Sequence, residues 1–329
     1  MADIDTSSTS STGRLSLSNF GVWGTILPLA SAWLVLIAVT GAVRSDFLAH
    51  QTVLAVAFTM AVVGTLAVGQ ALVAISGSMV DLSQPTSLIL SALVAVRLLE
   101  LEFAVTLAVA IAVLSGAAWG FLNALIIVYG KINPVIVTLA TNFIGLAALF
   151  LVFQIAESPI NSSFRAFGLG STLGIPNIWW PMVALIAVVG FFLPRTRYGR
   201  RAIAVGGSRF AAQARGISLP KTRFAIFTAA GAAAGLAGVL FACSSGPFTP
   251  SGGVVYLLPV IAAVILAGVT LSGGRGNLWI LLLSVGFLST VPTSLVFLGL
   301  SSDWQAIIQG LILVVAVAID GYEARRGTR

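Results

Sequence analysis

Apolar runs follow one another along almost the whole chain, separated by short breaks of glycine, proline and charge. A transmembrane helix needs roughly 20 predominantly apolar residues. The runs that approach or reach this length lie at 24–43, 51–70, 84–98, 104–128, 134–155, 177–194, 224–242, 255–272, 277–298 and 304–320. The pattern predicts an all-α fold, a polytopic transmembrane helical bundle of about ten spans.

The third run is shorter than the others and follows an interrupted apolar segment. Residues 71–83 read ALVAISGSMVDLS, in which glycine and serine break an apolar stretch. We therefore interpret 71–98 as one discontinuous or re-entrant element. Transporters often place interrupted helices of this kind beside the substrate site.

Two other runs carry glycines four residues apart, at Gly116/Gly120 and at Gly231/Gly235. Small residues at this spacing let two helices approach closely in lipid. We expect a tight bundle from them, and they carry no information about cargo.

Composition and charge agree with a membrane protein. Hydrophobic residues make up 58% of the 329 residues and charged residues 8%, against about 25% charged in soluble domains. Eight of the 17 Lys and Arg residues lie between Arg195 and Arg223, and no acidic residue occurs between Glu157 and Asp303. Such clusters mark cytoplasmic loops, so the net charge of +7 does not indicate a nucleic-acid partner.

The charge distribution also predicts orientation and domain limits. With ten spans and both termini cytoplasmic, 14 of the 17 basic residues lie inside, as the positive-inside rule requires. Residues 1–20 are rich in Ser and Thr, and we expect a disordered cytoplasmic tail there. A single transmembrane domain follows over 21–322, with a basic loop at 195–223 and a cytoplasmic tail at 323–329.

The chemistry of catalysis is not visible in the sequence. Cys243 is the only cysteine and His50 the only histidine, so we expect no metal site. No phosphate-binding G-x-x-x-x-G-K-[ST] motif is present, and LSGGRGN at 271–277 is interpreted as a tight cytoplasmic turn. We predict no catalytic residue and no cofactor bound by this chain.

The basic loop contains GRRAIAVGGSRFAAQARGI at residues 199–217. Ser208 is suited to cap a helix, and Gly216 is placed to end it in a left-handed conformation. A helix of about two turns follows, too short to be stable alone. Its alanines (Ala211, Ala212 and Ala214) would leave a smooth surface for a partner protein. A solvated loop that obeys the positive-inside rule explains the charge equally well.

A long gapped pattern covers the same loop. Its members are Thr196, Gly199, Arg200, Ala204, Gly206, Gly207, Ala211, Ala212, Gly216 and Ile217. The pattern resembles the T-x-x-G-R-x-x-x-A-x-G-G-N-x-x-A-A-x-x-x-G-I loop of permease subunits of ATP-binding-cassette (ABC) importers of the ribose, xylose and galactose type. IAAVILAGVTLSGGRG (261–276), NPVIVTLAT (133–141), SGSMVDLS (76–83) and AVAID (316–320) are similar to other stretches of that family. The likeness runs from about residue 50 to Asp320.

The resemblance implies a function and a set of partners. It implies a permease subunit in a prokaryotic inner membrane, which forms the path for a monosaccharide or similar small polar solute. A separate ABC ATPase would hold ATP and Mg, an extracytoplasmic solute-binding protein would deliver the solute, and a second permease copy or a paralogue would complete the path. The residues that it implies for coupling to the ATPase are Gly206, Gly207, Ser208, Ala211, Ala212, Gly216 and Ile217.

The chain departs from the family pattern at a few positions. Ser208 replaces the usual Asn but is still a competent helix cap. Leu257 stands where the family commonly has Glu, and Gln84 and Pro85 replace a usual Val-Gly. These departures concern the cargo and the gate rather than the fold.

Six polar residues in apolar runs are candidates for the substrate path. They are Gln70, Ser76, Ser78, Asp81, Asn123 and Asn142. Hydrogen bonding between helices is the alternative interpretation of each. Three other functions stay open: a ten-span secondary carrier of the drug/metabolite type, an ABC permease for a nucleoside, vitamin or branched-chain amino acid, and a membrane scaffold without transport.

Overall fold

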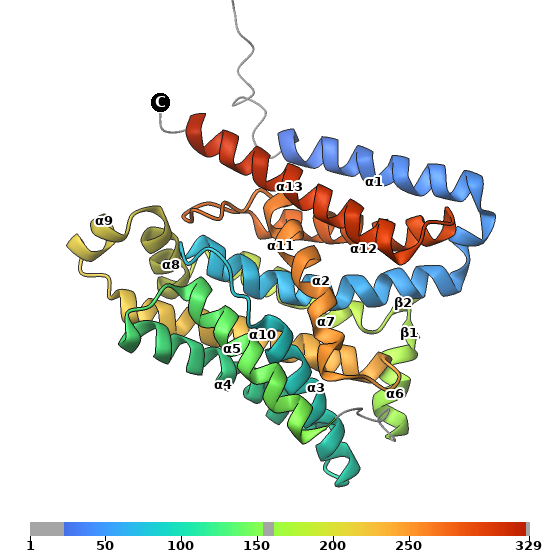
Figure 1. Ribbon diagram of the computed structural model, residues 1–329, viewed down its shortest axis with the longest axis horizontal. Coiled ribbons are helices and arrows are strands. Elements are labelled where there is room, and N and C mark those ends of the chain that lie inside the picture. The colour runs from blue at the N-terminus through green and yellow to red at the C-terminus, as the bar shows by residue number, and fades with distance from the viewer. Residues whose placement is uncertain (1–22, 154–160, 327–329) are drawn as a thin grey trace, which may run out of the picture.

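The computed structural model describes residues 23–153 and 161–326, and the predicted tail at 1–20 lies outside them (Figure 1). The elements are α1 (Trp23–Val43), η2 (Ser45–Leu48), α2 (His50–Ile75), α3 (Gln84–Glu100), α4 (Val105–Gly130), α5 (Pro134–Val152), α6 (Ser162–Leu169), β1 (Ser171–Thr172), β2 (Ile175–Pro176), α7 (Trp179–Phe192), α8 (Arg197–Gly207), α9 (Arg209–Ala214), α10 (Leu219–Ser244), η3 (Pro250–Tyr256), α11 (Leu257–Leu266), η4 (Leu278–Ile280), α12 (Leu281–Phe297) and α13 (Ser302–Arg326).

Every predicted apolar run contains a helix, so the all-α helical bundle is confirmed. Within the described ranges, six helices are long and apolar enough to cross a membrane, or seven if the bent pair α7–α8 is one span. The count of ten spans therefore stays a prediction. Besides the helices, β1 and β2 form one short antiparallel hairpin, which the sequence pattern did not indicate.

Helices α2 and α10 form the centre of the bundle. In the most apolar 18-residue stretch of each of these two helices, 67% of the residues are buried, compared with 11% in the corresponding stretch of α1. Helices α1 and α13 lie along one side of the bundle, and the start of α1 and the end of α13 point toward the end that carries α8 and α9 (Figure 1). Helix α6 and the hairpin β1–β2 lie at the opposite end.

The close helix approach predicted from glycine spacing is confirmed where α4 crosses α10. A Cβ atom on Gly116 would lie 2.5 Å from the Gly231 carbonyl oxygen and 2.7 Å from the Gly235 Cα. A Cβ atom on Gly120 would overlap the carbonyl oxygen of Phe227. The two backbones touch here, and no larger residue fits between them.

The broken element begins later than predicted. Helix α2 continues through residues 71–75, which we had assigned to the break, because all five are apolar residues that extend its buried helical pattern. The break comprises residues 76–83, and its second residue, Gly77, has φ 73°. Helix α3 then begins at Gln84 with Pro85 in its first turn, a position at which proline favours helix initiation.

Candidate functional site

The basic loop at 195–223 folds into two helices rather than one. Helix α8 is inclined by 76° to α7, and Thr196 caps it by accepting a hydrogen bond from the Gly199 backbone N–H at 3.1 Å. Residues three apart on one face of α8, namely Gly199, Ala202 and Val205, are buried. Sequence reasoning missed this helix, although the Thr196 cap and that spacing were visible signals.

The predicted short helix is confirmed as α9. Ser208 caps it by accepting from the Ala211 N–H at 3.3 Å. Gly216 follows at φ 76°, and the Ile217 N–H donates to the Ala212 carbonyl at 3.0 Å. This is the hydrogen-bond pattern of a helix ended by a left-handed glycine. We refer to α8 and α9 together as the coupling segment.

The exposed surface of α9 differs from the expectation. Ala212 is only 3% exposed, so its predicted place on a smooth outer surface is wrong. The small side chain faces inward because it lies on the side of the short helix that packs onto the rest of the protein. Phe210 is 84% exposed instead, and it was not among the predicted coupling residues. Aromatic side chains, Phe included, are enriched in protein–protein interfaces, so this position is suited to contact a partner protein.

Glycines from three distant segments meet directly behind the coupling segment. A Cβ atom on Gly206 would overlap the Ile75 carbonyl oxygen and lie 2.5 Å from the Gly274 nitrogen. A Cβ atom on Gly273 would lie 2.6 Å from the Gly77 Cα and 2.9 Å from the Gly206 Cα. We call this contact of Gly77, Gly206, Gly273 and Gly274 the glycine junction.

Two hydrogen bonds connect the same three segments. The Gly274 N–H donates to the Ile75 carbonyl at 2.9 Å, and the Arg209 guanidinium donates to the Gly77 carbonyl at 2.6 Å. LSGGRGN is a tight turn, as interpreted, closed by Gly273 N–H donating to Thr270 O at 3.1 Å. At Gly206 the coupling segment therefore contacts the end of α2 backbone to backbone, and the Arg209 side chain adds a hydrogen bond to Gly77 just beyond that end.

A chain of buried hydrogen bonds runs from the break into α4 and α5. The Asp81 carboxylate accepts from the Ser83 hydroxyl at 2.7 Å, and the Ser83 oxygen accepts from the Asn123 amide at 2.7 Å. The Asn123 carbonyl accepts from the Thr141 hydroxyl at 2.6 Å. Sequence reasoning proposed Asp81 and Asn123 but missed the two hydroxyl residues that join them.

Three other predicted path residues, Ser76, Ser78 and Asn142, make separate contacts. Asn142 on α5 accepts from the Thr86 hydroxyl at 2.9 Å. Ser76 donates to the Val73 carbonyl at 2.8 Å and to Ser78 at 3.3 Å. The structure thus brings Asp81 and Asn123 together through Ser83 and leaves Asn142 outside their chain. At 6% exposure or less, all six candidates lie inside the subunit.

Two buried glutamines keep an unused polar atom. The Gln70 carbonyl accepts from the Asp81 N–H at 3.3 Å, whereas its amide nitrogen has no partner among the residues that the structure describes. The Gln84 amide donates to the Leu66 carbonyl at 3.2 Å, whereas its carbonyl oxygen has no partner in the same ranges. The free donor of Gln70 lies near the end of α2, and the free acceptor of Gln84 lies at the beginning of α3. The break lies between them.

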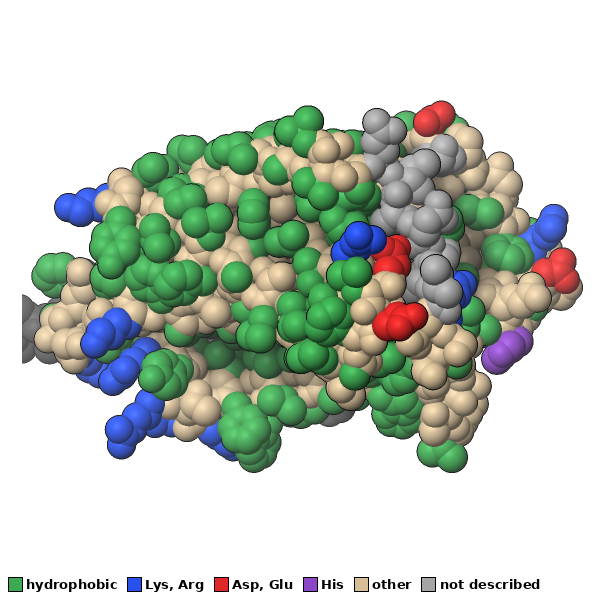
Figure 2. All heavy atoms as spheres, turned by 90° about the horizontal axis from the view of Figure 1, so that it is seen from below, with side chains coloured by type: hydrophobic (Ala, Val, Ile, Leu, Met, Phe, Trp, Pro, Cys, Tyr) green, Lys and Arg blue, Asp and Glu red, His purple; other side chains and the backbone are tan. Residues whose placement is uncertain are grey.

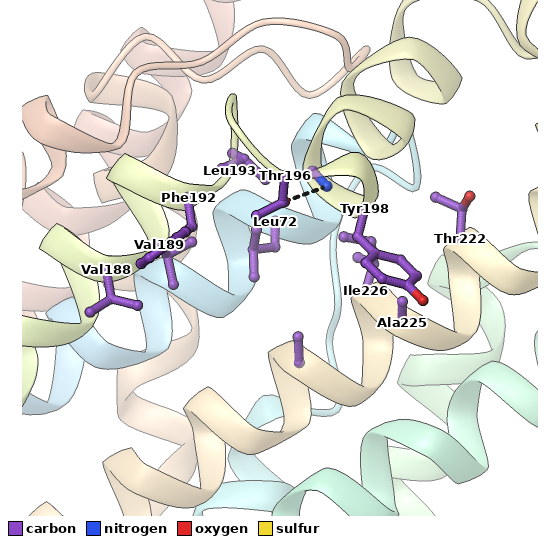
Figure 3. A pocket seen from close by; sticks show the side chains of 12 residues that line it. Leu72, Val188, Val189, Phe192, Leu193, Thr196, Tyr198, Thr222, Ala225 and Ile226 are labelled. Carbon is purple, nitrogen blue, oxygen red and sulfur yellow. Dashed lines mark hydrogen bonds between the residues drawn. The ribbon is translucent and has the colours of Figure 1, made fainter.

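Three of the cavities among the described residues differ in the chemistry of their linings. Cavities of about 290 Å³, beside the α7–α8 bend, and about 310 Å³, near α1 and α7, have mainly apolar linings. Figure 3 shows the first, where Thr196 already bonds within the chain. The third, about 200 Å³, includes Ser78 and three cationic residues. Of the six path candidates, only Ser78 lines any of the three.

Charge is distributed unevenly along the bundle. Lys and Arg side chains gather at the end that carries the coupling segment, while acidic side chains lie toward the other end together with some basic ones (Figure 2). Many large apolar side chains between the two ends are exposed. Such a band is what lipid tails solvate.

Comparisons with known proteins match this combination of bundle and basic segment. The family described as "Branched-chain amino acid transport system / permease component" matches residues 52–317. The chain belongs to this family. It is a multi-pass membrane protein of the permease class, and the resemblance expected from the coupling loop is confirmed.

Curated relatives cover nearly the full length. The chain is 31% identical to the ribose import permease protein RbsC of Escherichia coli (strain K12), over 88% of this chain and 91% of that protein. It is 32% identical to RbsC of Bacillus subtilis (strain 168), over 87% and 89%. It is 32% identical to the L-arabinose ABC transporter permease protein AraH of Azospirillum brasilense, over 94% and 91%. No solved structure matches the chain.

Proposed function

We propose that this chain is the transmembrane permease subunit of an ABC importer for a monosaccharide, which works with a separate ATPase. The observation that carries the proposal is the capped coupling segment, whose α9 exposes Phe210 while Gly206 touches the end of α2. The ribose and arabinose permeases among the relatives support a sugar as cargo.

The orientation follows from charge. The end with the coupling segment carries the gathered Lys and Arg side chains, which belong on the cytoplasmic side of a membrane. Both described chain ends point toward that side. The proposal therefore places the protein in the prokaryotic inner membrane with both termini cytoplasmic and α6 with the hairpin outside.

The coupling segment would pass movement from the ATPase to the path. Phe210 docks on the ATPase, which holds ATP and Mg. Differential affinity of ATP for two states of the assembly shifts the balance between them. Because Gly206 contacts the Ile75 carbonyl directly, a displacement of α8 moves the end of α2 and the break behind it.

The path itself would form beside the break. A sugar hydroxyl both donates and accepts hydrogen bonds, which suits the free Gln70 donor and the free Gln84 acceptor. Both are buried in the single subunit, so a sugar would reach them only after a movement of the break. A second permease copy or a paralogue would complete the path. A solute-binding protein on the outer side would deliver the sugar.

The alternatives make different predictions. A ten-span secondary carrier has no use for an exposed aromatic side chain on a capped basic loop. The family's description names branched-chain amino acid transport, so a non-sugar cargo is the second candidate. It would need charged contacts for an amino acid, and Asp81 is already bound to Ser83.

Cross-linking in native membranes tests the proposal. The exposed Gln213 of α9 is replaced by cysteine (Gln213→Cys), and the buried Cys243 is protected from reagent. We expect an adduct to an ATPase with a phosphate-binding loop, and loss of that adduct in the additional Phe210→Ser variant. Leu173→Cys, in the hairpin at the other end and 89% exposed, is the control. Labelling at position 213 without capture of an ATPase contradicts the importer and returns the secondary carrier to first place.

A further inference from the structure

A small basic cavity lies where the coupling segment meets the membrane bundle. Its volume is about 200 Å³. Four parts of the chain line it: the break after α2, the turn between α4 and α5, α9, and the first turns of α10. The lining residues are Gly77, Ser78, Met79, Lys131, Ile132, Asn133, Pro134, Arg209 and Arg223.

Among the described residues, no carboxylate lies beside the cations of this cavity. Lys131, Arg209 and Arg223 all line it, and none of its lining residues is acidic. Among the described side chains, the salt bridge found is a different one, between Arg97 and Glu100. Arg223 is partly buried and close enough to Arg209 for the two charges to repel each other. A bound anion would remove this repulsion.

The shape and rim of the cavity indicate which anion fits. Arginine guanidinium groups match the geometry of a phosphate group and bind it through paired hydrogen bonds. Beside the cations, the apolar residues Met79 and Ile132 are 50% and 43% exposed. A free inorganic anion gains nothing from such a rim, whereas a lipid covers it with its glycerol and acyl chains.

We propose that this cavity binds the phosphate headgroup of an anionic phospholipid. The proposal rests on the orientation given above, which places the cavity at the cytoplasmic leaflet. Basic pockets between transmembrane helices on that side are suited to anionic headgroups. Because Arg209 also donates to the Gly77 carbonyl, the lipid phosphate would hold α9 against the break.

Lipid binding to the purified full-length permease tests this directly. Delipidated protein is titrated with phosphatidylglycerol, with phosphatidylcholine, and with inorganic phosphate at matched ionic strength. Bound molecules are counted by native mass spectrometry. We expect saturable binding of phosphatidylglycerol, with weaker binding of the two other probes. In the Arg209→Gln/Arg223→Gln variant, phosphatidylglycerol affinity should fall by roughly tenfold or more, because hydrogen bonds to a charged group contribute at least that much.

A matched variant separates the cavity from the general basic surface. Arg197→Gln/Arg201→Gln removes the same charge from exposed positions of α8 that do not line the cavity, and we expect its affinity to stay within about twofold, since exposed charges contribute little. Lys131→Gln changes an exposed cavity residue between two helices. If the Arg209→Gln/Arg223→Gln variant fails to fold, Lys131→Gln is used in its place, and its affinity for phosphatidylglycerol should fall severalfold.

Each other outcome overturns the proposal. Equal loss in the cavity and α8 variants would mean that the lipid recognises net charge only. If inorganic phosphate bound as well as phosphatidylglycerol, and its binding fell in the same cavity variants, the occupant would be a free anion. Unchanged lipid binding with impaired ATPase capture would assign the cations to an acidic partner surface. The lipid assay contains no ATPase and no sugar, so failure of the proposed transport function leaves its result intact.

Discussion

Two regions of the molecule bring backbones together through glycine, and they do so in different ways. At the α4–α10 crossing, Gly116 and Gly120 face Gly231 inside regular helices. At the glycine junction, Gly77 and Gly273 adopt φ values of 73° and 96° at the ends of elements. The crossing joins two complete helices over several turns. The junction joins the ends of two helices and a turn, and such positions absorb the backbone rotation of a hinge.

The difference suggests a division of labour. A helix crossing packed over its length has one arrangement and serves stability. A junction made of helix ends and a turn can shift without breaking a helix, so it serves coupling. Substitutions that add one methyl group to each region test this contrast, since they leave all other side chains in place.

The largest effect is expected from Gly206→Ala. Its Cβ atom would overlap the carbonyl oxygen of Ile75, which cannot rotate away because it belongs to the backbone of α2. Overpacking costs about 1–3 kcal/mol and sometimes more, and we expect about 3 kcal/mol here. Uptake of radiolabelled sugar and sugar-stimulated ATPase activity should both be lost, and the thermal unfolding midpoint of the purified protein should fall.

Gly207→Ala is the control for this change. A Cβ atom on Gly207 would meet no atom within 4 Å, although the residue is the neighbour of Gly206 in the same helix. Alanine is the better helix former, so stability should stay equal or rise slightly and uptake should persist. If both variants lost uptake equally, helix propensity rather than contact with α2 would be the cause.

Gly120→Ala at the α4–α10 crossing should have a smaller effect. Its Cβ atom would overlap the Phe227 carbonyl oxygen, but the other turns of the long α4–α10 contact stay in place. We expect a loss of about 1–2 kcal/mol in the free energy of unfolding, seen as a lower unfolding midpoint. This decrease in the unfolding midpoint should be the same whether or not the ATPase is bound to the permease with its nucleotide.

Gly310→Ala in α13, which would meet no atom within 4 Å, controls for the change in helix propensity. An unfolding midpoint for Gly120→Ala that depends on nucleotide would contradict the division between the two regions, because it would give the crossing a part in coupling.

Asn123 links the two regions, since it lies on α4 and donates to Ser83 in the break. Asn123→Ala removes this bond and the one from Thr141. Hydrogen bonds between membrane helices contribute about 0.6 kcal/mol each, so a loss of about 1 kcal/mol is expected. If uptake per folded molecule is unchanged, the residue is structural. If uptake falls far more than stability, Asn123 lines the path.

The sequence predicted one of the two regions and not the other. The spacing of Gly116 and Gly120 within one apolar run is a local signal, and the structure confirms it. The glycine junction joins Gly77, Gly206 and Gly273, which are separated by more than sixty positions from one another. No local pattern relates such residues. In the same way, the Ser208 cap predicted α9, whereas the inward side of Ala212 depends on how the helix packs.

The smallest expected effect concerns the start of α9. Ser208→Ala removes the oxygen that accepts from the Ala211 N–H at 3.3 Å, and loss of such a cap costs about 1 kcal/mol. The bundle does not depend on this short exposed helix, so the global unfolding midpoint should stay nearly constant. Hydrogen exchange of the α9 amides should become several times faster, because the helix opens more often.

Ser208→Asn separates the cap from the serine itself. Asparagine caps a helix as well as serine does, so exchange in this variant should remain as slow as in the parent protein, and ATPase capture through position 213 should be retained. In Ser208→Ala, capture of the ATPase through position 213 should weaken severalfold, while the unfolding midpoint of the whole protein stays nearly constant. If the alanine variant captured the ATPase as well as the asparagine variant, α9 would not need to be preformed. The partner would then fold α9 on contact, and α8 would be the preformed part of the coupling segment.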